Sequence, residues 1–403
     1  MRAVHPTRIR SASFTLGIAS RAILRIAAPA AMVAASLSSS SFSTPAFVPN
    51  PNLRGIFAGS GSDCMHDERV AREILDMVAA VRREREGNDA EEGGTAPAPR
   101  VLYLGTATYD LPCFRERQTS RLAEMGCAVS SLDVSGQSPP PPVLEREVGR
   151  ADVLVVGGGN TLHAIDRWGR VGLIPVLRRA ADRGCVLTGG SAGAIWAFDG
   201  GHSDSADPDT YRSPMLEKYG GGGGGEGSSP GAAAGDESSS PPDDGPPAAD
   251  WEYLRVPGLN LLPGLLCPHH DMVQSNGLLR SDDFDSMLLR HRGERGIGID
   301  HWAALCVEGD RYRVLSIPGK PGSVLAVDGH AGEEKAPCPD RTGVPGIWIK
   351  EASAAGGVRR WVCPPQGKIA DLLRSASEIV EDVAALERCR DANPDLAPPA
   401  PLN

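Results

Sequence analysis

The chain has 403 residues, of which 41% are apolar, so it is long enough to bury a large core. Its formal charge of −10 at pH 7 argues against a general nucleic-acid-binding role. Nine cysteines at irregular spacing include no C-x-x-C pair, which disfavours a zinc site or a disulfide framework and favours unpaired thiols.

The N-terminal residues differ in composition from the rest. Residues 1–54 hold six Arg and no Lys, Asp or Glu in a Ser/Ala-rich background, which is typical of an organellar transit peptide for a plastid or mitochondrion. Without such targeting we expect a cytoplasmic protein. A plain disordered extension is the first alternative. A secretory signal core is the second, because the apolar run 27–37 is too short to span a bilayer and contains Pro29.

Strands and helices are predicted to alternate through the first half of the chain. An amphipathic helix is expected over 68–86, followed by strands at 100–108, 127–134, 151–161 and 185–190. Helices are expected at 114–126, from 162, at 173–183 and from 191 through 198. This alternation predicts a mostly parallel sheet with helices on both faces. Catalytic groups are then expected in the loops after the strands, at 105–108, 157–161 and 189–193.

The second half begins with a Gly/Ser/Pro-rich segment, residues 219–250, which we expect to be a disordered insertion. Regular structure is expected to resume at 251–271, with a helix at 281–291, a hairpin over 296–316 that turns at 308–310, a strand at 346–351 and one helix over 368–388. We therefore predict a single α/β domain over 55–390 and a disordered tail at 391–403.

One serine stands in a pattern of small residues at a strand-to-helix junction. Gly189-x-Ser191-x-Gly193 is the nucleophile-elbow pattern, in which a sharp turn exposes the hydroxyl at the start of a helix. The N–H of Ala192 is then placed to donate to an oxyanion. The alternative is a tight glycine turn that only packs a helix on a sheet.

A serine needs a base, and the base needs an orienting acid. His269 and His270 follow a strongly apolar run, so we predict His269 as the base and His270 as its packing or substrate-side neighbour. Asp300 ends another short apolar strand and is the predicted acid. This Ser, His, acid order differs from that of α/β-hydrolases.

Three consecutive glycines, 157–159, raise the alternative of a phosphate cradle. The spacing of G-x-G-x-x-G is absent, and no G-K-[ST] follows, so a nucleotide cofactor is poorly supported and no cofactor or metal is expected. We predict that Gly158 or Gly159 supplies a second oxyanion N–H. Asn160 and Thr161 of the same loop are candidate substrate-binding residues.

Several segments together resemble the peptidase E family, the aspartyl dipeptidases and their cyanophycinase relatives. They are VLYLGTAT, VVGGGNTLHAI, LTGGSAGAIWAFDGGHSDS, GLNLLPGLLCPHHD and GIGIDHWAAL, within residues 100–316. The resemblance implies a flavodoxin-like or class I glutamine amidotransferase-like α/β sandwich, with Ser191 as nucleophile, His269 as base and an oxyanion hole at Gly158 and Ala192. The family's Glu falls opposite His301, beside Asp300, and its usual aromatic residue falls at His270.

The resulting expectation is a metal-independent serine peptidase that acts on small peptides, such as Asp-X dipeptides. The alternatives are a cyanophycinase-like β-aspartyl hydrolase, an esterase, and a silent protein that binds a small carboxylate ligand. Arg115, Arg117 and Arg212 are candidates to receive a substrate carboxylate. The expected partner is a small peptide, without nucleic acid or membrane insertion, and the protein is expected to be a monomer or homodimer.

Overall fold

The computed structural model describes residues 47–86, 97–220, 250–325 and 340–393. Most of the predicted leader, insertion and tail therefore lies outside the described residues. Leu53 is only 2% exposed, and Phe47 packs against the core. The packed chain thus begins before residue 55, because these apolar side chains cover one edge of the core.

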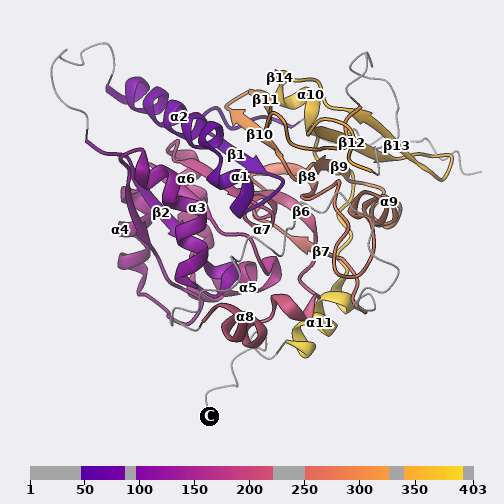
Figure 1. Ribbon diagram of the computed structural model, residues 1–403, viewed down its shortest axis with the longest axis horizontal. Helices are drawn as coiled ribbons and strands as arrows, with labels where there is room; N and C mark the ends of the chain where they lie inside the picture. The colour runs from indigo at the N-terminus through magenta and orange to yellow at the C-terminus, as the bar shows by residue number, and fades with distance from the viewer. Residues whose placement is uncertain (1–46, 87–96, 221–249, 326–339, 394–403) are drawn as a thin grey trace, which may run out of the picture. The chain divides into compact units, whose positions relative to one another are not determined.

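The first sheet has eight strands in the order β14-β11-β10-β1-β5-β4-β2-β3 (Figure 1). Neighbouring strands from β1 to β3 in this order pair in parallel, and β10, β11 and β14 continue the sheet with antiparallel pairs. The bounds are β1 (Arg54–Ala58), β2 (Arg100–Leu104), β3 (Ala128–Ser131), β4 (Val153–Val156), β5 (Val186–Gly190), β10 (Ala303–Glu308), β11 (Arg311–Ser316) and β14 (Gln366–Lys368).

The parallel part of this sheet has the order of a flavodoxin-like fold. Counted from β2, the strands β3-β2-β4-β5 stand in the order 2-1-3-4, and β1 pairs with the outer side of β5. All residues of β4 and β5 are buried, as expected for parallel strands covered on both faces. The predicted α/β fold is therefore confirmed, and the predicted hairpin corresponds to β10 and β11.

Helices cover both faces of the first sheet. Side chains of α1, α2 and α3 pack against one face, and side chains of α4, α5 and α6 pack against the other together with residues of the second sheet. The helix bounds are α1 (Ser62–His66), α2 (Glu68–Glu86), α3 (Pro112–Glu124), α4 (Pro141–Arg150), α5 (Thr161–Val171), α6 (Ile174–Asp182), α7 (Ala192–Ile195), α8 (Arg212–Tyr219), α9 (Arg280–Arg290), α10 (Ile369–Leu372) and α11 (Val383–Ala392). Helix α2 matches its predicted bounds.

A second sheet, which the sequence did not lead us to expect, has six strands in the order β13-β12-β9-β8-β6-β7. Its bounds are β6 (Phe198–Ser203), β7 (Leu254–Pro257), β8 (Leu262–Cys267), β9 (Arg295–Ile299), β12 (Ile347–Ala352) and β13 (Val358–Val362). The helix predicted through residue 198 is wrong at its end, because α7 ends at Ile195 and β6 begins at Phe198. Every residue of β6 is buried, so tertiary packing holds this segment extended.

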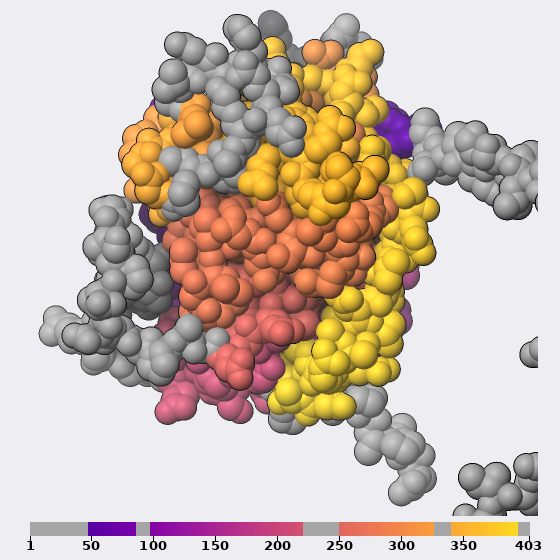
Figure 2. Space-filling view, turned by 90° about the vertical axis from the view of Figure 1, so that its right-hand side faces the viewer, coloured from indigo at the N-terminus to yellow at the C-terminus, as the bar shows by residue number. Residues whose placement is uncertain are grey.

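The single helix predicted over 368–388 is also wrong. Only the short α10 and the later α11 are helical, and residues 373–382 between them are not. This connecting segment lies against the loop before β9, where the N–H of Ser377 donates to the carbonyl of Gly293. Ile379 and Val380 are each 45% exposed, so the middle of the apolar stripe that suggested a helix is not buried, whereas residues at its two ends are. Figure 2 shows the C-terminal segment, in yellow, beside residues 250–325, in orange.

Among the described residues, no helix is both long and apolar enough to cross a membrane. The eight cysteines in this part of the chain are all unpaired thiols.

Candidate active site

Ser191 follows the last residue of β5 and precedes α7, as the elbow pattern predicts. Its backbone is strained, with φ 58° and ψ −125°, a conformation that persists only where the surroundings enforce it. A Cβ on Gly193 would lie 2.0 Å from the carbonyl oxygen of Val156, and one on Gly190 would lie 1.8 Å from that of Ser60. The glycines are therefore needed because neighbouring backbone approaches the turn too closely for any side chain.

Two backbone amides border the serine. A Cβ on Gly158 would lie 3.4 Å from the Cβ of Ser191, so this glycine stands directly beside it. Ala192 is the first residue of α7, where helix N–H groups have no intrahelical partner. Within the described ranges the N–H groups of Gly158 and Ala192 have no acceptor, and the hydroxyl of Ser191 makes no hydrogen bond. The predicted oxyanion donors thus lie next to the predicted nucleophile.

His269 follows β8 and is held to the same loop as the serine. Its N–H donates to the carbonyl of Gly59 at 3.0 Å, and the N–H of Ser191 donates to that of Ala58 at 3.2 Å. Like the serine, His269 has a positive φ, here 48°. Burial lowers the pKa of His269 well below its ordinary value of 6.5, which keeps the imidazole neutral at pH 7 and able to accept a proton.

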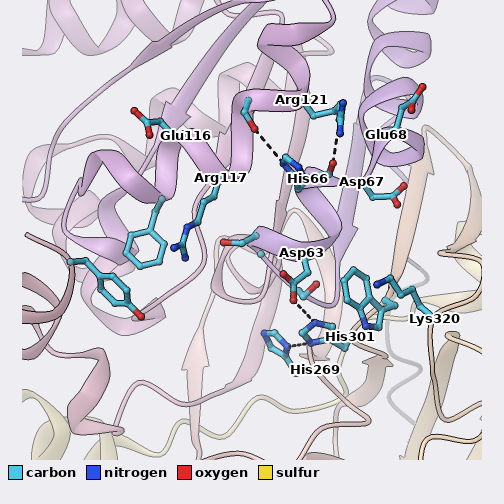
Figure 3. A pocket seen from close by; sticks show the side chains of 17 residues that line it. Asp63, His66, Asp67, Glu68, Glu116, Arg117, Arg121, His269, His301 and Lys320 are labelled. Atoms are coloured by element: carbon cyan, nitrogen blue, oxygen red, sulfur yellow. Dashed lines mark hydrogen bonds and ion pairs between the residues drawn. The ribbon is translucent and has the colours of Figure 1, made fainter. Parts of the chain in front are cut away.

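The neighbour of His269 is a second histidine. The Nδ1 atoms of His269 and His301 lie 2.9 Å apart, and the Nε2 of His301 lies 2.8 Å from Oδ2 of Asp63 (Figure 3). Asp63 comes from α1, His301 from the β9–β10 turn and His269 from the end of β8. The pKa of Asp63 is lowered mainly by its hydrogen bond with His301, so the carboxylate is ionised.

Asp300 does not contact His269, which corrects the predicted triad. Its Oδ2 accepts the N–H groups of Ser323 at 2.9 Å and Gly346 at 3.0 Å, and its Oδ1 accepts the Ser323 hydroxyl at 2.6 Å. The nearest histidine nitrogen is Nδ1 of His270, at 3.4 Å. Burial raises the pKa of Asp300 to about 6. This carboxyl joins three segments of the fold and is fully occupied in doing so.

We therefore expect Asp300→Ala to act on stability. The variant leaves two buried N–H groups and a hydroxyl without an acceptor, which costs about 3 kcal/mol or more of the free energy of unfolding. Urea denaturation should show this loss, while kcat per folded molecule stays within a few-fold of the native value. A native unfolding midpoint combined with a large loss of kcat would contradict this role.

The predicted substrate-binding residues are buried in packing roles. Asn160 caps α5 by accepting the N–H of His163, and its amide donates to Ser205 O and Thr210 Oγ1. Thr161 accepts the hydroxyl of Ser203. His270 is fully buried, and a Cβ on Gly298 would lie 2.4 Å from its ring. None of the three lines the pocket described next.

A pocket of about 990 Å³ opens beside His269 and His301. It contains both acidic and basic side chains, and its walls come from the loop after β1, α1, α3 and the segment that follows β11. Arg117 is the one of the three predicted carboxylate receivers that lines this pocket. Two further cations, Arg121 and Lys320, also line it. Arg115 instead reaches Ser131 Oγ at 3.4 Å. Within the described residues, no group of three or more His, Cys, Asp or Glu side chains is placed to hold a metal ion.

Sequence reasoning missed Asp63 and His301 as a pair. The available signal was the short apolar strand RGIFA, now β1, followed by the loop GSGSD, which resembles the other strand ends. That strand lies between β5 and β10, so its loop enters the site. The contact between Asp63 and His301 spans 238 positions, and no local pattern predicts it.

A model of peptidase family S51 matches residues 91–221, which include the glycine loop and Ser191. The uncharacterized peptidase YgaJ of Bacillus subtilis (strain 168) is 38% identical over 112 residues, covering 28% of this chain and 48% of that protein. A Trypanosoma brucei brucei protein named G2/mitotic-specific cyclin-1 is 30% identical over 334 residues, covering 80% of this chain and 88% of that protein. That name refers to the cell cycle and not to proteolysis.

Two solved structures are also similar. A putative peptidase E protein from Listeria monocytogenes EGD-e has 15% identity and a TM-score of 0.38, covering 65% of this chain and 98% of its own. A peptidase from an acI-B1 Actinobacterium has 13% identity and a TM-score of 0.43, covering 83% and 99%. These TM-scores are too low to support conclusions about the site.

Proposed function

Because the chain belongs to peptidase family S51, the peptidase E family, we propose that it hydrolyses small peptides, including Asp-X dipeptides, through Ser191 and an acyl-enzyme. The observation that carries the proposal is the strained serine with an unbonded hydroxyl beside two unbonded amides. Strained backbone that close glycine contacts enforce is common at functional sites.

In the proposed reaction, the Oγ of Ser191 attacks the carbonyl carbon and its proton passes to Nε2 of His269. The N–H groups of Gly158 and Ala192 stabilise the oxyanion of the tetrahedral intermediate. The C–N bond then breaks, and the leaving amine takes the proton from His269. Water then attacks the acyl-enzyme and gives a proton to the same nitrogen. The bond between the acyl carbon and Oγ of Ser191 breaks, His269 returns the proton to that oxygen, and the acid product leaves.

The pocket supports small charged substrates. Arg117 and Lys320 line the same pocket as His269, and a cation there suits a substrate carboxylate. This favours Asp-containing peptides over neutral ones.

The test uses the purified full chain and a panel of Asp-X dipeptides with Asn-X dipeptides as matched controls. We expect kcat/KM for Asp-X to exceed that for Asn-X at least about tenfold, the effect of one charge-assisted contact. β-Aspartyl-arginine peptides and short-chain esters complete the panel. Turnover of the β-aspartyl-arginine peptides alone would indicate a cyanophycinase-like hydrolase, and turnover of the esters alone would indicate an esterase. Failure of a fluorophosphonate to label Ser191 would favour a silent binding protein.

A further inference from the structure

His301 and Asp63, which are hydrogen-bonded in series to His269, have no role in the predicted triad. We propose that His301 and Asp63 are the positioning residues of the general base, with the ring of His301 inserted between the carboxylate and His269. The inference rests on the proposed function, since it assigns the partners of the base in that reaction. In this arrangement the acid, Asp63, acts on His269 through His301 and not by direct contact.

The hydrogen-bonding capacity of each group fixes the direction of the series. An ionised Asp63 only accepts, so Nε2 of His301 donates to it. When the His301 ring carries a single proton, that proton is the one on Nε2, so Nδ1 accepts and Nδ1 of His269 is the donor. This leaves the lone pair of His269 on Nε2, the atom that has to take the proton of Ser191. The series therefore selects the catalytic tautomer.

Hydrogen bonds hold the backbone of His301, and a neighbouring aromatic ring packs against its side chain. Its backbone N–H donates to Oδ1 of Asp271 at 2.7 Å, its carbonyl accepts the thiol of Cys64 at 3.1 Å, and its ring meets the edge of Trp302 at 5.0 Å between centroids. The ring is also only 6% exposed. Such a ring can hold a neighbouring imidazole in one orientation without reorganising during the reaction.

Two other acids near His301 in the chain or in space already have partners of their own. Asp300 is occupied by Ser323 and Gly346, and Asp271 holds the His301 N–H and Arg341. When His269 becomes an imidazolium, its Nδ1–H still points to His301, and the charge is stabilised by Asp63 through the polarised ring. No proton has to leave His301 for this to happen.

A double-mutant cycle in the full chain tests the inference. Asp63→Asn should lower kcat for an Asp-X dipeptide at least about tenfold with little change in KM. The single variant His301→Glu places a carboxylate directly against His269, so its kcat should lie within about tenfold of the native value. In that background Asp63→Asn should have no further effect. Asp76→Asn on the exposed face of α2 is the matched control and should leave kcat unchanged.

The pH profile adds a readout that a structural role would not move. Removal of the Asp63 charge destabilises protonated His269, so the acid limb of kcat/KM should shift to lower pH in Asp63→Asn. The other charged groups around Asp63, His301 and His269 stay the same in this comparison; they are Lys320, Arg117, Arg280, Arg341 and Asp271.

Histidine ¹⁵N NMR of the native chain tests the same point without turnover. We expect a proton on Nε2 of His301 and on Nδ1 of His269. The opposite tautomers, or an equal loss of kcat from Asp63→Asn in both backgrounds, would overturn the inference. If the tautomers are as expected but no peptide is hydrolysed, the proposed function alone is overturned. If Ser191-dependent turnover is normal but the tautomers are the opposite ones, only this inference is overturned.

Discussion

Ser191→Ala is expected to reduce kcat/KM for the best dipeptide on the order of 10⁴-fold or more, because no other group at the turn can form the acyl-enzyme. The free energy of unfolding should stay within about 0.5 kcal/mol of the native value, since the lost hydroxyl makes no hydrogen bond to any described residue. Steady-state hydrolysis and urea denaturation measure the two quantities.

Ser286→Ala is the matched control for this experiment. That hydroxyl lies on the exposed side of α9 and donates only to the carbonyl of Asp282, so both activity and stability should be retained. Retained turnover in Ser191→Ala would remove the serine from the reaction. A large loss of stability would show instead that the turn needs the hydroxyl for its structure.

Gly193→Ala is expected to unfold the region around the site. The new Cβ would lie 2.0 Å from the carbonyl oxygen of Val156. The backbone segments of Gly193 and Val156 are closely packed and cannot move apart independently. Separating β4 from α7 should cost about 3 kcal/mol or more of the free energy of unfolding. Urea denaturation, followed by circular dichroism, measures this loss.

Gly149→Ala provides the opposite result in the same measurement. That glycine lies on the exposed face of α4 with no atom within 4 Å of an added Cβ, so alanine should stabilise the protein by up to about 1 kcal/mol. Native stability in Gly193→Ala would mean that the glycine is not required by the close approach of β4.

The positions of Ser191 and His269 were predictable from sequence because each depends on short-range pattern. Apolar runs such as VLVV and VLTGG identify buried strands, and the small residues after them mark the turns at the sheet edge. The order of the motifs also indicated the family. The helix predicted over 191–198 failed because β6 is extended by pairing with β7 and β8, and those pairings involve residues more than 50 positions away.

The sequence by itself determined the α/β alternation, the elbow with its glycines and the histidine after β8, since all three follow from local conformational preference. Only the tertiary structure decided which groups surround that histidine. Asp300 and His301 are adjacent in the chain, yet the turn after β9 directs one side chain to Ser323 and the other to His269 and Asp63. The physical reason is that the path of the backbone through a turn sets where each side chain points, and a contact across 238 positions leaves no local signal.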